Sequence, residues 1–507
     1  MKKVFATLFA GLMVSAQVMA VSVKDVCGQF NGLLNIAGFN YPDKSVYLLP
    51  GSENNTVTFV LPDFKYGAGK LGNIVLPNIP MDANGQLTLE NSTLYLDSIS
   101  ERATITILNG LEDQGQIYNS IVTDEGAMVI LSIGAPSLPE AILVLFVGEK
   151  ATGLNCALPN AGFEGAWTNE EPEGWHSFGT ATGLMADFVK GNTYQFIQSS
   201  EVRPGSTGSN SAMLSSDLVF GVKANGNCTN GQINAGSMTA DAPADNYNFS
   251  DPTNEGFNTP FSGRPDSIAF WAKYLPADRD VNNEVNKARV SAELTTNARY
   301  QDPETGDFAN ARIAGAAMNY PATAEMGWQR ISVPFEYVSE QTPAFILVTF
   351  TTNQVPGGGS SYSEGSGLSK KSVLDTLFLD DVELVYNRQL LSFNIGEQPV
   401  SFVDNVATVA SNYCDDCAKF SAEADGVSAQ NFIAFDATHK CILVYVIADD
   451  YAQTGAYSLY TVKFADSEEG VENIAGEAVR CEKVLLDGVL YIRRGGVLYN
   501  TNGIRVQ

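Results

Sequence analysis

The segment at residues 158–178, "LPNAGFEGAWTNEEPEGWHSF", gathers residue types that could do chemistry. It contains Trp167, Trp175 and His176, and four glutamates lie among them, at positions 164, 170, 171 and 173. Aromatic rings stack on the apolar C–H faces of sugars, whereas carboxylates bind cations or transfer protons. The same residues could instead form the start of a β-domain, with Phe163 and Trp175 in its core and the Glu-Glu-Pro-Glu turn in solvent.

Further aromatic residues in strand-like patterns are candidates for sugar binding. In "DSIAFWAKYLP" the side chains of Ile268, Phe270 and Ala272 share one face, and Trp271 lies on the other. If the first face is core, Trp271 is available at the second surface; packing under a loop is the alternative. The candidate carbohydrate-binding residues are Trp271, Trp175, Trp328 and His176.

A calcium ion is the cofactor that the acidic residues suggest. Calcium takes six to eight oxygen ligands, largely from carboxylates and backbone carbonyls. Glu164 lies near the start of the central unit, and Asp380 and Asp381 lie near its end, where first and last strands often pair. These three are the candidate metal ligands; solvated strand-edge acids are the alternative.

Catalytic motifs are scarce. The chain has only two histidines, His176 and His439, and it lacks the G-x-S-x-G and H-E-x-x-H patterns. Glycoside hydrolysis needs two carboxyl groups at a defined separation, and 57 acidic residues always offer candidates. No catalytic residue is therefore named.

Nearly every segment around these residues has the pattern of a β-strand. Ala103, Ile105 and Ile107 alternate with Thr104 and Thr106, and Asn-Gly and Asp-Gly turns punctuate the chain. The sequence therefore predicts an all-β protein. The expected units are a signal peptide (1–20), a barrel (21–153), a jelly-roll sandwich (154–387), a small β-sandwich module (388–466), and an acidic linker with a β-meander tail (467–507).

The first twenty residues have the pattern of a secretory signal. Lys2 and Lys3 precede an apolar stretch, and Val18-Met19-Ala20 provides a cleavage site after Ala20. We expect export to the envelope, the outer-membrane surface or the exterior, with no transmembrane segment in the mature chain. A net charge of −27 argues against a nucleic-acid partner, which requires clustered Lys and Arg.

Export permits disulfides among the seven cysteines. Cys27 and Cys156 flank the barrel, so a bridge between them is one hypothesis. Cys414 and Cys417 form a C-x-x-C pair, which favours a local disulfide or a bridge from one of them to Cys441.

The central unit resembles the putative carbohydrate metabolism domain of exported Bacteroides-type proteins. The resemblance rests on the 158–178 segment, "RPDSIAFWAKYLP", "GWQRISVPFEY" and "LFLDDVELVY". "CGQFNGLLNI" resembles the start of a calycin-like (lipocalin-type) barrel, and the C-terminal segment resembles the short β-tail of exported Bacteroidetes proteins. These resemblances imply a jelly-roll akin to carbohydrate-binding modules and a barrel that could hold a small apolar ligand.

The predicted function is non-catalytic binding of a glycan or polysaccharide by a secreted or cell-surface protein. Two alternatives belong to other classes. One is a structural or adhesive envelope protein, and the other is a glycan-active hydrolase.

Overall fold

The computed structural model describes residues 20–66, 69–95, 102–113, 115–136, 140–152, 155–168, 171–190, 196–219, 222–239, 242–276, 287–320, 327–354, 374–410, 419–465, 482–486, 489–494 and 497–499. Strands dominate these residues, which confirms the all-β prediction. The α-helices are short: α1 (Val23–Val26), α2 (Ala186–Lys190) and α3 (Tyr451–Thr454). No helix in the described ranges has the length and hydropathy needed to span a membrane. The predicted signal peptide lies outside the described residues, apart from Ala20.

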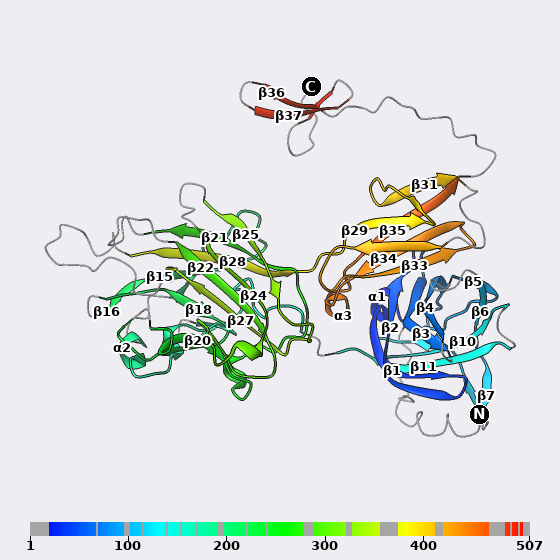
Figure 1. The fold of residues 1–507 in the computed structure, drawn as a ribbon, viewed down its shortest axis with the longest axis horizontal. Coiled ribbons are helices and arrows are strands. Elements are labelled where there is room, and N and C mark those ends of the chain that lie inside the picture. Colours follow the sequence, from blue (N-terminus) through cyan, green and yellow to red (C-terminus); the bar gives the residue numbers. More distant parts are fainter. Residues whose placement is uncertain are drawn as a thin grey trace.

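The first sheet curls into a nearly closed antiparallel barrel (Figure 1). Its strand order is β4-β3-β2-β1-β11-β10-β6-β5, with β9 beside β10, and β4 contacts β5 across the seam. The strands are β1 (Gly28–Ile36), β2 (Phe39–Pro50), β3 (Thr56–Tyr66), β4 (Gly69–Pro80), β5 (Ser92–Leu94), β6 (Ala103–Ile107), β9 (Ile121–Val122), β10 (Gly126–Gly134) and β11 (Ile142–Lys150). A hairpin of β7 (Leu111–Asp113) and β8 (Gln116–Tyr118) lies beside them.

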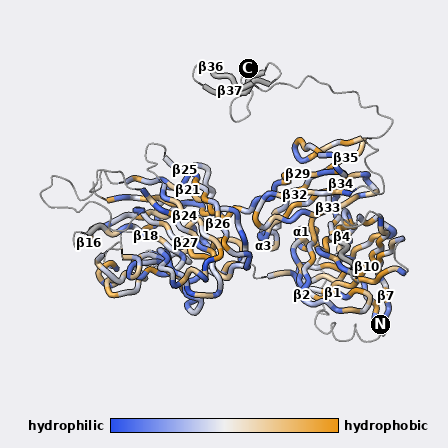
Figure 2. The backbone as a smooth tube through the Cα atoms, viewed as in Figure 1, coloured by the Kyte–Doolittle hydropathy of each residue, from blue (hydrophilic) through white to orange (hydrophobic). Residues whose placement is uncertain are grey.

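Large apolar side chains fill the barrel. On β6 the side chains of Ala103, Ile105 and Ile107 are buried while the threonines between them are not, as the alternation predicted. Phe30, Phe59, Phe64 and Phe146 belong to one buried cluster with these residues, and the hydrophobic colouring follows the barrel strands (Figure 2). The small apolar ligand expected here gains no support from this packed interior and stays a prediction.

The cysteines at the two ends of the barrel are not joined. Cys27 packs against the barrel core, whereas the Cys156 thiol donates to the Asp449 carbonyl at 3.5 Å, and both are free. The predicted Cys27–Cys156 disulfide is therefore wrong, because Cys156 faces the neighbouring units. Cys441 is also a buried free thiol, which excludes its bridge to the C-x-x-C pair. Cys414 and Cys417 lie outside the described residues.

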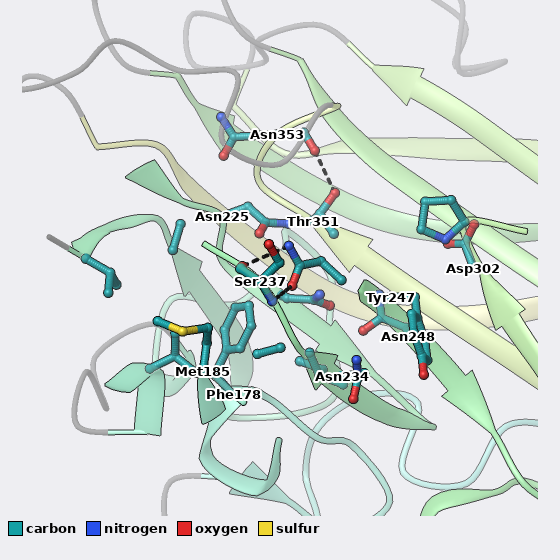
Figure 3. A pocket seen from close by; sticks show the side chains of 18 of the residues that line it. Phe178, Met185, Asn225, Asn234, Ser237, Tyr247, Asn248, Asp302, Thr351 and Asn353 are labelled. Carbon is teal, nitrogen blue, oxygen red and sulfur yellow. Dashed lines mark hydrogen bonds between the residues drawn. The ribbon is translucent and has the colours of Figure 1, made fainter. Parts of the chain in front are cut away.

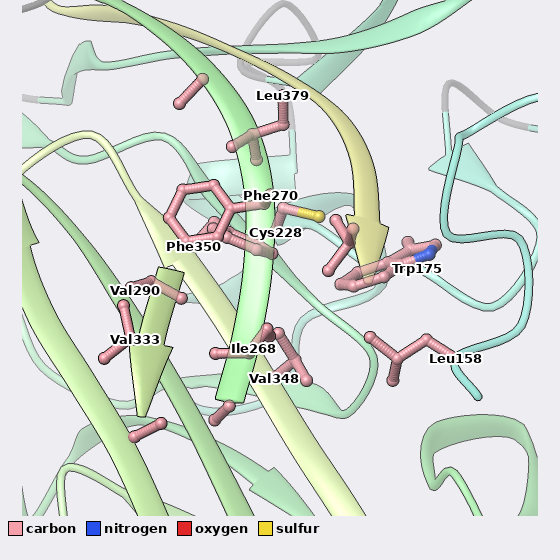
Figure 4. Close-up of a cluster of buried hydrophobic side chains, with 14 of the residues drawn as sticks. Leu158, Trp175, Cys228, Ile268, Phe270, Val290, Val333, Val348, Phe350 and Leu379 are labelled. Carbon is pink, nitrogen blue, oxygen red and sulfur yellow. The ribbon is translucent and has the colours of Figure 1, made fainter. Parts of the chain in front are cut away.

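The central unit is a sandwich of two five-stranded antiparallel sheets. Sheet one runs β14 (Phe196–Ser199), β15 (Ser211–Ser215), β28 (Thr376–Val385), β21 (Ser267–Leu275), β25 (Gln329–Pro334). Sheet two runs β18 (Asn227–Thr229), β27 (Phe345–Thr351), β22 (Ala288–Thr295), β24 (Arg312–Tyr320), β26 (Glu336–Tyr337). Ile268, Phe270 and Ala272 point into the core between the sheets, as predicted from the alternation on this strand (Figure 4).

Smaller elements surround the sandwich. A three-stranded sheet of β19 (Gln232–Ala235), β20 (Asn246–Ser250) and β23 (Tyr300–Asp302) packs through β20 against β27. Two hairpins, β12 (Trp167–Thr168) with β13 (Glu171–Pro172) and β16 (Asp217–Val219) with β17 (Val222–Ala224), complete the unit. The 3₁₀ turns are η1 (Phe178–Thr180), η3 (Glu255–Phe257) and η4 (Ala309–Ala311).

A C-terminal module packs on the barrel. It contains two sheets. The three-stranded sheet has the order β30 (Gln398–Pro399), β29 (Leu390–Ile395) and β32 (Phe420–Ala424). The four-stranded sheet has the order β31 (Val406–Ala410), β35 (Tyr457–Ala465), β34 (Cys441–Ile447) and β33 (Gln430–Asp436). Tyr451 donates to the Leu48 carbonyl at 2.6 Å, and Tyr445 lies 3.0 Å from the Thr58 hydroxyl. The tail is an antiparallel meander of β36 (Glu482–Leu486), β37 (Val489–Arg494) and β38 (Val497–Tyr499).

Candidate ligand pocket

The aromatic residues of the 158–178 segment belong to the sandwich core. Trp175 is fully buried, its ring lies 5.3 Å from that of Phe163, and its indole N–H donates to the Asn160 carbonyl at 3.2 Å. Figure 4 shows Trp175 among Leu158, Cys228 and other core side chains. Because no face of the ring reaches solvent, the candidate role of Trp175 in sugar stacking is wrong. The alternative, that Trp175 and Phe163 anchor the core, is confirmed.

Among the acids of the same segment, Glu171 has hydrogen-bond partners within the protein. Glu171 is buried, and its Oε1 accepts hydrogen bonds from the backbone N–H and the hydroxyl of Ser177, both at 2.7 Å. The expectation of a fully solvated turn is therefore wrong for Glu171, because its carboxylate accepts hydrogen bonds from the Ser177 loop. Glu173 is exposed, and Glu170 lies outside the described residues.

His176 stands beside this carboxylate, with Nδ1 3.4 Å from Glu171 Oε2 and its ring centroid 4.4 Å from that of Phe257. It lines a polar cleft of about 550 Å³. Its role in carbohydrate binding stays a prediction.

Two of the predicted calcium ligands, Asp381 and Glu164, meet around Gly162, whereas the Oδ1 atom of the third, Asp380, is buried without a hydrogen-bond partner among the described residues. A Cβ atom on Gly162 would lie 3.2 Å from Asp381 Oδ1 and 3.8 Å from Glu164 Cγ. The Glu164 carboxylate accepts the N–H groups of Ser209 and Asn210 at 2.9 and 2.8 Å. Arg203, however, supplies a cation to this corner.

Arg203 Nε donates to Asp381 Oδ2 at 2.5 Å, and the Arg203 backbone N–H donates to Asp380 Oδ2 at 3.0 Å. Burial raises the pKa of Asp380, and the Arg203 N–H opposes that rise. Among the described residues no group of three or more His, Cys, Asp or Glu side chains could hold a metal ion. Calcium at this corner stays a prediction.

Trp271 and Trp328 lie on the outer face of sheet one and are half-buried. The Arg203 guanidinium sits over the Trp271 ring, 5.1 Å from its centroid. The Trp328 ring packs edge-on against Phe378, with centroids 6.3 Å apart. Both indoles are partly engaged by protein, so their part in sugar binding also stays a prediction.

A pocket whose residues were not among the predicted site residues opens on the outer face of sheet two. Its volume is about 380 Å³, in the range of about 300–1,000 Å³ typical of small-ligand sites. Two rows of side chains, from two different sheets, contribute to its lining. One row crosses sheet two through Asn227, Thr351 and Arg289, which are register neighbours. The other comes from the three-stranded sheet, where Asn248 pairs with Asp302.

Buried amide groups of this pocket have atoms without a hydrogen-bond partner. Asn225, Asn227 and Asn248 are 4%, 6% and 5% exposed, and all three line the pocket. Within the described part of the chain, Asn225 Nδ2, Asn227 Oδ1 and Asn248 Oδ1 make no hydrogen bond. One donor and two acceptors thus lack a hydrogen-bond partner, and each of these atoms is itself buried. A buried polar group without a partner costs about 1–3 kcal/mol, which makes such a cluster unusual unless something else satisfies it.

The charges at the pocket cancel. Arg289 makes a two-pronged ion pair with Asp302, in which Nη1 and Nη2 each lie 2.8 Å from a carboxylate oxygen. These are the charged residues among the lining side chains, so the pocket surface is neutral overall. The pair also ties β22 to β23 and so fixes the distance between the two rows.

A second carboxylate lies deeper on the same face of β22. Burial raises the pKa of Glu293 to about 7, although Arg312, whose Nε lies 2.8 Å from Glu293 Oε2, opposes the rise. Glu293 does not line the pocket. Its side chain pairs with Arg312 instead.

Apolar side chains also line the pocket, and some lie beside the amides, since Ile233 is the register partner of Asn248. Met185, Val189, Ile233 and Met238 line it together with Phe178, and Figure 3 shows Met185 and Phe178 on the side away from Asn225 and Thr351. Met238 is 54% exposed at the mouth. The pocket therefore presents amides together with methyl and aromatic groups.

The sequence did contain a signal for this site. Asn246 and Asn248 are two residues apart within one strand, so their side chains point to the same face, and Asn225 lies two residues before Asn227, just ahead of β18. Asparagine is depleted in strands, so paired asparagines inside strand segments indicate a function for their amides. Part of that function is structural, because Asn246 Oδ1 accepts the N–H groups of Gly236 and Ser237 at 3.0 and 3.1 Å.

No protein-family model matches the chain, and no curated protein matches it. Three solved structures resemble it weakly. A candidate glycoside hydrolase from Bacteroides vulgatus is 15% identical, with a TM-score of 0.29 over 55% of this chain and 97% of its own. A carbohydrate-binding module of the β-sandwich superfamily is 6% identical, with a TM-score of 0.22 over 66% and 95%. A candidate outer membrane protein from Bacteroides fragilis is 10% identical, with a TM-score of 0.16 over 66% and 99%. At these TM-scores the similarities assign neither a fold family nor a function.

Proposed function

We propose that this chain is a secreted or cell-surface glycan-binding protein that holds a sugar in the asparagine-lined pocket without cleaving it. The observation that carries the proposal is the set of unpartnered amide atoms on Asn225, Asn227 and Asn248. Sugar hydroxyls donate and accept hydrogen bonds, so they suit a site that offers one donor and two acceptors. The signal-like pattern of the first twenty residues supports export.

The acids around the pocket favour binding over hydrolysis. Glycosidases of both stereochemical classes use two carboxyl groups that flank the scissile bond. Asp302 is the carboxylate among the lining residues, and both its oxygens are held by Arg289. A carboxylate held in this way is poorly placed to act as nucleophile, acid or base.

A glycan array with the full-length mature protein tests this proposal. We expect binding to a restricted set of glycans, and we expect Asn227→Ala to weaken it by about tenfold or more, since a lost buried hydrogen bond costs about 1–3 kcal/mol. Asn319→Ala is the matched control, because Asn319 is exposed on β24 and does not line the pocket. A protein that binds no glycan would favour the structural or adhesive alternative.

A further inference from the structure

We infer that the pocket selects a neutral hexose residue that carries an N-acetyl group. This inference rests on the proposed function and deepens it by naming the class of sugar. It follows from the amide and apolar groups that line the pocket and from the way the pocket's charges are paired.

The ion pair at the pocket argues for a neutral ligand. Arg289 directs both terminal nitrogens at Asp302, so the guanidinium is already bound to a carboxylate in the geometry that a sugar acid would need. An anionic sugar would have to displace Asp302, which is only 5% exposed. An amino sugar with a free ammonium group would need a free carboxylate, and Asp302 is not one. Both kinds of charged sugar are therefore disfavoured.

The asparagine amides complement an acetamido group. An acetamide N–H can donate to an unpartnered asparagine Oδ1, and its C=O can accept from an unpartnered Nδ2. Asn227 and Asn248 supply the first kind of atom and Asn225 supplies the second. Ring hydroxyls alone could also satisfy these atoms, so the amides by themselves do not separate an N-acetylated sugar from its parent hexose.

The apolar side chains of the pocket make that separation. Met185, Val189, Ile233 and Met238 give a surface that a ring hydroxyl cannot satisfy but that the acetyl methyl group can cover. Burying a methyl-sized group in an apolar pocket discriminates by about 10- to 200-fold. Met238, which lines the pocket and is 54% exposed, adds an apolar surface that the C–H face of the next sugar of a chain could cover.

The test is a ligand-observed NMR titration of the full mature chain with methyl glycosides. The probes are N-acetylglucosamine, N-acetylgalactosamine, glucose, galactose and the 6-deoxyhexose fucose. We expect at least one N-acetylated sugar to bind about tenfold or more tightly than its parent hexose. Equal affinity for the parent, or tighter binding of the 6-deoxyhexose, would overturn the inference.

A pair of methionine variants locates the methyl group. Met238→Gln keeps the length of the side chain but adds polar atoms at the mouth, and we expect it to reduce the preference for the N-acetylated sugar by about tenfold while binding of the parent hexose persists. Met318→Gln is the control, because Met318 is 43% exposed on β24 and does not line the pocket. An unchanged preference in Met238→Gln would overturn the role assigned to the apolar side chains.

The two proposals fail in different ways. If sugars bind and Asn227→Ala abolishes their binding, but acetylation makes no difference, only the N-acetyl inference falls. If no sugar on the array or in the titration binds the mature protein, the glycan-binding proposal falls with it.

Discussion

The 158–178 segment and the asparagine-lined pocket lie in the same sandwich, yet they differ in how their polar groups are used. In the segment the conspicuous residues have partners. Trp175 packs in the core, and Glu171 accepts two hydrogen bonds from Ser177. In the pocket the inconspicuous residues have unpartnered atoms, on Asn225, Asn227 and Asn248. The pocket therefore differs from the segment in having buried polar atoms without a partner.

The largest effect on stability should come from a substitution in the core part of the 158–178 segment. Trp175→Ala removes a fully buried ring that packs against Phe163 and Phe350, and we expect a loss of about 3–5 kcal/mol in unfolding free energy. Denaturant unfolding of the full chain measures it. Trp328→Ala, at a half-buried site, should cost less. An unchanged stability with a lost glycan affinity would reverse the comparison and make Trp175 a binding residue.

The buried carboxylate of Glu293 should make stability depend on pH. Because the pKa of Glu293 is raised from 4.5 to about 7, its contribution to stability is fully present below pH 4.5 and is lost as the pH rises through about 7. Each unit of such a shift corresponds to about 1.4 kcal/mol. Glu293→Gln should flatten the dependence of melting temperature on pH between pH 4.5 and about 7. Parallel curves for the two proteins would show that Glu293 ionises as it does in water.

Glu171→Ala should destabilise the protein without changing its affinity for sugar. The substitution leaves the Ser177 N–H and hydroxyl without their acceptor, so we expect a loss of about 1–3 kcal/mol, with Glu171→Gln intermediate. Glu173→Ala is the matched control, because Glu173 is exposed and surface changes usually stay within about 0.5 kcal/mol. If Glu171→Ala instead weakened glycan binding at constant stability, the cleft at His176 would become the better site.

The smallest effect concerns the outer aromatic face of sheet one. Trp271→Ala should leave the pocket's glycan affinity unchanged, because Arg203 covers the ring and the pocket lies on the other sheet. The array that tests the pocket also tests this variant. A clear loss of affinity would restore Trp271 as a sugar-binding residue and would indicate a second binding face.

Local pattern predicted local features well. The alternation in 267–275 placed Ile268 and Phe270 in the core and Trp271 outside it, because strand periodicity fixes which face a side chain takes. It could not predict that Glu171 would be buried under the Ser177 loop or that Cys156 would turn toward Asp449, since both depend on packing between distant segments. The pocket joins residues from 178 to 354, and only the sheet order brings them together.

The central claim is that the pocket's unpartnered amide atoms are kept for a ligand at the expense of stability. Asn248→Leu tests it most directly, because leucine has nearly the same shape and removes the unpartnered Oδ1. Replacing an unsatisfied polar group by an apolar one of the same shape is neutral or stabilising. We predict an equal or higher melting temperature together with a loss of glycan binding of about tenfold or more. A lower melting temperature with unchanged glycan binding would contradict the account.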